Sequence, residues 1–112
     1  MNLMNLSKKV CKVCEGTEKP FTLNEINKYL EYVNNWEMID NGKAIEKEFI
    51  FKDFKEAINF VNKIAEIAEQ EGHHPDISLH NYKKVKITLS THKINGLSEN
   101  DFILASKIDG LF

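Results

Sequence analysis

This chain lacks long apolar runs, a signal-like segment and a strong excess of one charge. Its 112 residues carry a formal net charge of −2, which gives no electrostatic attraction to nucleic acid or anionic lipid. No apolar run approaches the roughly 20 residues that span a membrane, and the N-terminus has no apolar stretch typical of a secretory signal. We therefore predict a cytoplasmic protein that binds neither a membrane nor nucleic acid directly.

Cysteine is equally scarce, because Cys11 and Cys14 are the only two in the chain. A disulfide framework is excluded, which fits a compartment that keeps thiols reduced. A zinc site would need a second pair of ligands, and only the histidines remain as candidates. A redox pair would be expected at a helix start beside a strand, which the local sequence does not offer. We therefore assign the pair no role in a site.

Several catalytic motifs are also missing. The chain has no glycine-rich loop for phosphate, no serine nucleophile elbow and no HExxH pattern, which argues against nucleotide hydrolysis, serine esterases and zinc proteases of the familiar kinds. The composition is otherwise that of an ordinary globular protein, with 42% hydrophobic and 29% charged residues. Its length suits one domain with its own core.

Apolar periodicity predicts an irregular leader over residues 1–20 and one α+β domain over 21–112. Capping-box spacings at Thr22 and Asp53, and an N-cap at Ser98, predict three helix starts. Alternating segments between them predict strands. The expected elements are helices over 22–33, 53–71 and 98–108, and strands over 36–39, 45–51, 77–81 and 85–91. The α-β-β-α-β-β-α order predicts two layers, a four-stranded antiparallel sheet with helices packed on one face.

The helix over 53–71 has an apolar face wider than one sheet contact needs. Ala57, Ile58, Val61, Ile64, Ala65 and Ala68 fall at helical offsets, and Phe60 and Ile67 lie beside them. We expect the chain to self-associate as a homodimer or homotetramer through the uncovered part of this face. An alternative function is a protein-interaction module, for dimerisation or coactivation, that uses the same side of the helix.

Three histidines stand at related places in the predicted sheet. His73 and His74 precede the third strand, and His92 follows the fourth. If the intervening turn is centred between Tyr82 and Lys83, position 73 faces 92 and position 74 faces 91, so all three meet at one end of the sheet. A slip of one residue would change these pairs. His80 lies mid-strand, away from this end, and we interpret it as structural or exposed.

Three readings of this cluster stay open. A histidine at a helix C-terminus can simply complement the helix dipole, although this does not account for two in a row with a third opposite them. Histidines with no nucleophile beside them favour proton transfer, such as an elimination or hydration. A metal site made of His73, His74, His92 and Asp101 is the third possibility, although we predict neither metal nor cofactor. Asp101 either complements the dipole of the last helix or orients a histidine.

At these positions the sequence resembles the pterin-4a-carbinolamine dehydratases. The matching residues are Glu69-x-x-x-His73-His74-Pro75, Tyr82-x-x-Val85, Leu89-Ser90-Thr91-His92 and Gly96-Leu97-Ser98-x-x-Asp101, with Trp36 and a hairpin upstream. The family has the same order of elements. The resemblance implies a hydro-lyase, a 4a-hydroxytetrahydrobiopterin dehydratase, which eliminates water from a 4a-hydroxytetrahydropterin and yields quinonoid dihydropterin in tetrahydrobiopterin recycling.

The resemblance also implies roles for individual residues. His73, His74 and His92 would be catalytic, with His73 and His92 as the acid–base pair and His74 chiefly positioning the pterin. Ser90 and Thr91 would offer hydrogen bonds to the pterin, Asp101 would support the histidines, and Trp36 would wall the site. The sequence departs from the family pattern at Gly72, where an acidic residue is common, and in a 74–82 segment one residue longer than in the animal form. Family members also serve as dimerisation cofactors of a transcription factor.

Overall fold

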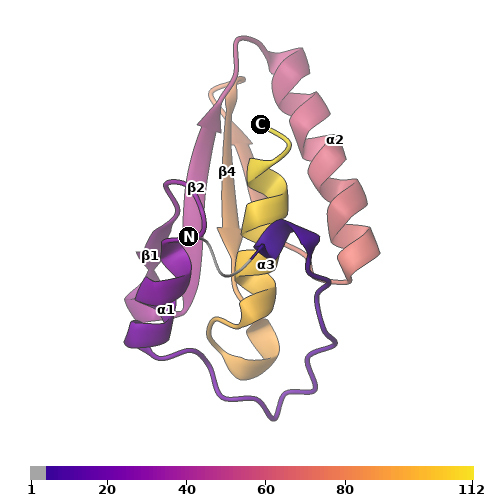
Figure 1. Cartoon of the computed structure of the whole chain (residues 1–112). Helices are drawn as coiled ribbons and strands as arrows, with labels where there is room; N and C mark the ends of the chain where they lie inside the picture. The colour runs from indigo at the N-terminus through magenta and orange to yellow at the C-terminus, as the bar shows by residue number, and fades with distance from the viewer. Residues whose placement is uncertain (1–4) are drawn as a thin grey trace.

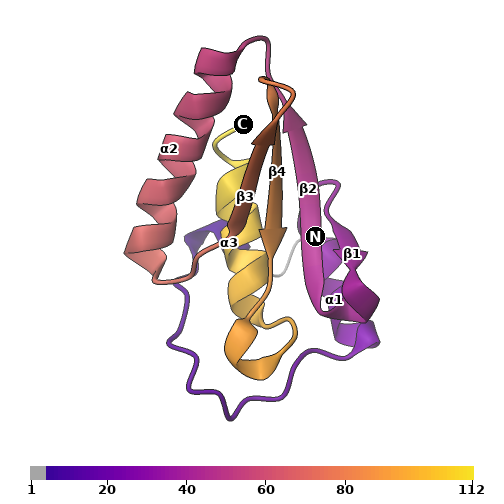
Figure 2. The same ribbon diagram turned by 180° about the vertical axis from the view of Figure 1, so that it is seen from behind.

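A computed structural model describes residues 5–112 as three helices and a four-stranded antiparallel sheet. The elements in chain order are α1 (Leu23–Leu30), β1 (Glu37–Ile39), β2 (Ala44–Ile50), α2 (Phe54–Glu71), β3 (Asp76–His80), β4 (Lys84–Leu89) and α3 (Glu99–Asp109). The helices lie on one face of the sheet, and the view from behind shows the strands uncovered (Figures 1 and 2). The predicted α+β order and its two layers are confirmed. Among residues 5–112, no helix is both long and apolar enough to cross a membrane.

The helices begin where the sequence predicts, because their first N–H groups find side-chain acceptors. Thr22 Oγ1 accepts from Glu25 N–H at 3.3 Å, and Glu25 Oε1 accepts from Thr22 N–H at 2.9 Å, which completes a capping box. Asp53 Oδ1 accepts from Glu56 N–H at 2.9 Å at the start of α2. At the other end of α2, Gly72 adopts φ 65°, a left-handed conformation that glycine takes without strain. That turn leads directly into His73.

The core lies between the sheet and the two longer helices. α2 buries Ala57, Phe60, Ile64 and Ala68, while Ala65 of the predicted apolar face is exposed. α3 is enclosed along most of its length, and Phe102, Ile103, Leu104, Ala105 and Ile108 are at most 1% exposed. Because α3 runs through the interior, it can carry a polar side chain to a buried position.

The sheet order is β1-β2-β4-β3, so β2 and β4 form its centre. In the second hairpin Asp76 pairs with Thr88 and His80 with Lys84. The register predicted from a turn between Tyr82 and Lys83 is therefore wrong by one residue. Asn81 and Tyr82 have positive φ angles of 49° and 52°, which makes a three-residue loop centred on Tyr82. The ladder also stops at Asp76, so the histidines lie beyond it and do not face each other as strand partners.

Candidate active site

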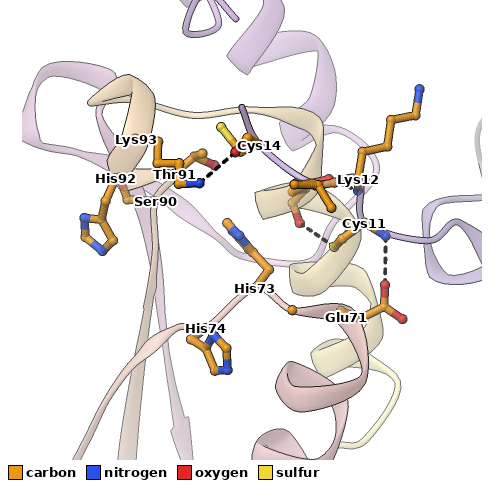
Figure 3. Close-up of a pocket in the computed structure, with 13 residues that line it drawn as sticks. Cys11, Lys12, Cys14, Glu71, His73, His74, Ser90, Thr91, His92 and Lys93 are labelled. Atoms are coloured by element: carbon orange, nitrogen blue, oxygen red, sulfur yellow. Dashed lines mark hydrogen bonds between the residues drawn. The ribbon is translucent and has the colours of Figure 1, made fainter. Parts of the chain in front are cut away.

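A pocket of about 340 Å³ lies at the end of the molecule where α2 and β4 end and α3 begins. His73, His74 and His92 all line it, together with Ser90 and Thr91 (Figure 3). The predicted convergence of the three histidines is thus present despite the shifted register. It arises because His73 and His74 follow the end of α2, while His92 follows β4 and opens the short 3-10 turn η3 (His92–Ile94).

A buried carboxylate holds His73. The Nε2 atom of His73 lies 2.6 Å from Asp101 Oδ1, and Asp101 is fully buried. The second oxygen, Oδ2, accepts from Thr91 Oγ1 at 2.8 Å and from the Ser98 N–H at 3.0 Å. A carboxylate can only accept, so Nε2 of His73 carries the proton and, in the neutral imidazole, Nδ1 is the acceptor. Asp101 therefore fixes the tautomer of His73, which is the histidine-orienting role of the two predicted for it. The same carboxylate lies in the first turn of α3, where its negative charge complements the helix dipole.

His74 and His92 are more open to solvent than His73. The Nε2 atom of His74 lies 2.5 Å from Glu69 Oε2, and both side chains are largely exposed. Glu69 is one turn back on α2, so this pair orients the His74 ring but adds little stability. His92 is exposed at the start of η3. His80, in contrast, lies on β3 and its Nε2 is 2.9 Å from Glu48 Oε1, outside the pocket.

The hydroxyl groups of Ser90 and Thr91 are bound within the protein. Ser90 Oγ donates to the carbonyl oxygen of Lys43 at 2.7 Å. Thr91 is 3% exposed, and its Oγ1 lies 2.8 Å from Ser98 Oγ besides donating to Asp101. In this geometry Thr91 acts on the site through Asp101 and His73.

Trp36 lies outside this pocket. It is 5% exposed, and its Nε1 donates to Asp109 Oδ1 at 3.0 Å. The same carboxylate oxygen accepts from Lys47 Nζ at 2.8 Å, so a partly buried ion pair fixes the indole in the core beside Phe49. Asp101 too does not line the pocket directly, and it is linked to the pocket through His73 and Thr91.

The pocket also has a wall that the sequence reasoning missed. Its members come from the N-terminal leader and from residues next to the predicted site, and they are Cys11, Lys12, Val13, Cys14, Glu71, Lys93 and Asn100. Single hydrogen bonds to distant residues hold the leader in place, and such bonds require no periodic apolar pattern. The leader sequence therefore contains no periodicity from which this wall could be predicted. The local signal is slight, and consists of the paired cysteines and the polar Asn100 in the first turn of α3.

Burial and charge affect one titratable group of this wall strongly. Burial, together with the neighbouring Glu71 carboxylate, raises the pKa of the Cys11 thiol to about 12. Cys11 therefore stays a protonated thiol near neutral pH. Within residues 5–112 no three His, Cys, Asp or Glu side chains are grouped so that they could hold a metal ion, so the geometry gives the metal-site alternative no support.

Comparison with known proteins places the chain in a family. Residues 19–111 match the family model described as pterin 4 alpha carbinolamine dehydratase. A protein of Alkaliphilus metalliredigens, provisionally named pterin-4-alpha-carbinolamine dehydratase, is 48% identical over 94% of each chain. A relative from Methylococcus capsulatus with the same provisional name is 42% identical over 99% of this chain and 96% of its own.

Two solved structures share the fold. A crystal structure from Brucella melitensis, described as a transcriptional coactivator/pterin dehydratase, has a TM-score of 0.78 at 35% identity and covers 83% of this chain and 98% of its own. A pterin dehydratase-like protein described as a RuBisCO assembly factor in the alpha-carboxysome shares the fold alone, with a TM-score of 0.60 at 24% identity over 70% of this chain and 89% of its own. The match over nearly the whole domain places this chain in the pterin 4 alpha carbinolamine dehydratase family.

Proposed function

We propose that this protein is a hydro-lyase that eliminates water from a 4a-hydroxytetrahydropterin and serves tetrahydrobiopterin recycling. The observation that carries the proposal is the His73–Asp101 pair in a pocket that His74 and His92 also line. The pocket volume of about 340 Å³ is in the range of small-molecule sites. The names of the relatives support the same substrate class.

The reaction needs one proton donor and one proton acceptor. The bond between C4a and its hydroxyl oxygen breaks, and that oxygen leaves as water after it takes a proton. The N5–H proton departs, and the electrons of that bond form the C4a=N5 double bond of the quinonoid product. Imidazole groups can perform both transfers near neutral pH.

The environment of each histidine suggests its part. Asp101 would stabilise the imidazolium that forms when His73 takes a proton, so His73 is the base for N5–H, through Nδ1. His92, which follows β4, is the acid that protonates the leaving hydroxyl. His74, held by Glu69, positions the pterin. Water can return the transferred protons because His92 is open to solvent.

A direct assay tests the activity. Purified protein is expected to accelerate the dehydration of a synthetic 4a-hydroxytetrahydropterin in proportion to its concentration, because the pocket supplies both proton-transfer groups. The measurement is the ultraviolet absorbance of the quinonoid product, with heat-denatured protein as the control. A rate equal to the uncatalysed one at every protein concentration would contradict the proposed activity.

Self-association is the second part of the proposal. Phe54 at the start of α2 is 53% exposed, and Ile50 and Phe112 are 55% and 68% exposed. Exposed apolar side chains of this size mark a surface that meets a partner where they form one contiguous patch. The alternative function of an interaction module uses the apolar side of the helix over 53–71, and the description of the Brucella melitensis structure as a coactivator gives that alternative a precedent. A cytoplasmic location stays a prediction from the sequence.

Light scattering of the purified chain is expected to give the mass of a dimer or tetramer of the 13.0 kDa protomer, because burying these side chains is favourable by about 25 cal/mol per Å² of apolar surface. Phe54→Lys should shift the mass toward the monomer, while Val10→Lys, at an exposed apolar residue of the leader, should leave it unchanged. A monomeric mass for the unmodified chain would count against self-association.

A further inference from the structure

The described part of the N-terminal leader, residues 5–20, is fastened to the domain near both of its ends. Leu6 is 2% exposed and belongs to the core. At the other end the Phe21 N–H donates to the Leu97 carbonyl oxygen at 2.8 Å. Pro20 packs so closely on Gly96 that a Cβ at position 96 would lie 2.5 Å from its Cβ, and this approach requires glycine. Between these ends the leader passes around the end of the molecule that holds the pocket (Figure 1).

Hydrogen bonds fix the middle of the leader, residues 11–14, which we name the strap. The Cys11 N–H donates to Glu71 Oε1 at 2.8 Å. Lys12 and Asn100 bond in both directions, with the Lys12 N–H donating to Asn100 Oδ1 at 2.9 Å and Asn100 Nδ2 donating to the Lys12 carbonyl at 2.6 Å. Lys93 Nζ donates to the Cys14 carbonyl at 3.1 Å (Figure 3). The strap backbone is thus bound by side chains of three separate elements.

Each of these anchors is a close chain neighbour of a site residue. Glu71 is two residues before His73, Lys93 directly follows His92, and Asn100 directly precedes Asp101. The short stretches that position the histidines therefore also position the strap. Asn100 is 8% exposed, so its two bonds are well shielded from water and hold the strap firmly.

Two strap residues that line the pocket are left partly or largely exposed by the rest of residues 5–112. Val13 lines the pocket and yet is 85% exposed. Cys14 lines it as well and is half-buried. Val10 lies three residues before Val13 and is 69% exposed, but it is not among the residues that line the pocket. An apolar side chain that faces a binding pocket becomes covered when a flat, partly apolar ring occupies it.

We propose that the strap is a wall of the substrate site, in which Val13 and Cys14 contact the bound pterin and determine its affinity. The inference rests on the proposed function, because the occupant is the pterin on which the histidines act. It adds to the site a segment that precedes the residues 19–111 matched by the family model. The strap binds the ring and takes no part in proton transfer, so its effect falls on KM.

Two matched substitutions test the contact. Val13→Asp is expected to raise KM for the 4a-hydroxytetrahydropterin by about tenfold, the cost of replacing an apolar contact by a hydrated charge, with kcat within about twofold of the unmodified protein. Val10→Asp makes the same change on the same segment and is expected to leave both constants unchanged. A merely structural role for Val13 would move kcat, KM and thermal stability together, so the KM-specific effect separates the two explanations.

Ligand protection of Cys14 gives a second readout that does not depend on turnover. In the Cys11→Ser variant, Cys14 is the remaining thiol, and serine can keep the bond to the Asn100 carbonyl that Cys11 Sγ makes at 3.6 Å. Saturating 7,8-dihydrobiopterin, a non-reacting probe, is expected to slow alkylation of Cys14 by iodoacetamide at least about fivefold, because the bound ring shields the thiol. Mass spectrometry of the intact protein measures the rate.

The outcomes separate this inference from the proposed function. If the unmodified protein is active, but Val13→Asp behaves as Val10→Asp does and dihydrobiopterin leaves the alkylation rate unchanged, the strap is not a wall of the site and the catalytic assignment stands. If the unmodified protein neither accelerates dehydration nor binds dihydrobiopterin, both the catalytic assignment and the strap inference fail.

Discussion

His73→Ala is expected to lower kcat for dehydration by about 100- to 1000-fold, the size of effect that positioned acid–base groups supply. The reason is local, because His73 is the histidine whose proton position is set by a buried carboxylate at 2.6 Å. Its substitution removes the base and leaves the pocket otherwise intact. The measurement is the initial rate of quinonoid product formation at saturating substrate, compared with the unmodified protein.

Two further histidine variants make this result interpretable. His92→Ala should also lose most of the activity, because it removes the proposed acid. His80→Ala is the matched control, since His80 is exposed on β3 and pairs with Glu48 outside the pocket, and its rate should equal that of the unmodified protein. Unchanged rates in both His73→Ala and His92→Ala would refute the acid–base assignment.

Asp101→Asn is expected to reduce both activity and stability. The asparagine side chain keeps the shape but cannot stabilise an imidazolium, so kcat should fall about 10- to 100-fold. Its amide also puts an N–H group in place of one acceptor oxygen, at a site where three donors converge on the buried carboxylate. A buried donor left without an acceptor costs about 1–3 kcal/mol, and the free energy of unfolding should fall by about that amount.

Urea denaturation and the dehydration assay measure the two effects on the same sample. Asp53→Asn is the control, because Asp53 also accepts a backbone N–H in the first turn of a helix but lies away from the pocket. Asparagine is as good an N-cap as aspartate, so this variant should change stability by less than about 0.5 kcal/mol and leave the activity alone. An Asp101→Asn protein with full activity would show that the carboxylate does not support His73.

The sequence predicted the helices and hairpins well because each is specified locally. The capping residues Thr22 and Asp53, the left-handed Gly72 and the alternation of apolar residues act within a few positions along the chain. The pairing of β2 with β4 at the centre of the sheet is different. It depends on how the second hairpin docks after α2, which no short pattern encodes.

The sequence predicted the site in outline, and the errors in that prediction have physical causes. The histidines converge because they follow the ends of α2 and β4, which does not depend on the hairpin register. That register was wrong because Asn81 and Tyr82 both adopt positive φ and lengthen the turn. Trp36 was placed at the site by resemblance, whereas its N–H is held in the core by Asp109. Hydrogen-bond partners more than sixty residues apart have no signature in one sequence.

The strap is the clearest example of this limit. Its backbone is fixed by Glu71, Lys93 and Asn100, which are 60, 79 and 88 residues from their partners in the chain. The sequence therefore predicted an irregular leader and assigned it no role in the site. The contacts that order it are single polar bonds, and only the folded chain brings the two sides of each bond together.

Asp101 has a consequence for how this protein can change over evolution. Active-site groups often reduce the stability of a fold, so that mutations which remove them stabilise the protein while they abolish its activity. Asp101 is an exception, because one carboxylate closes the first turn of α3, accepts from Thr91 and holds His73. Selection for a stable fold therefore retains the partner of the proposed catalytic base, even in a lineage where the reaction itself is no longer needed.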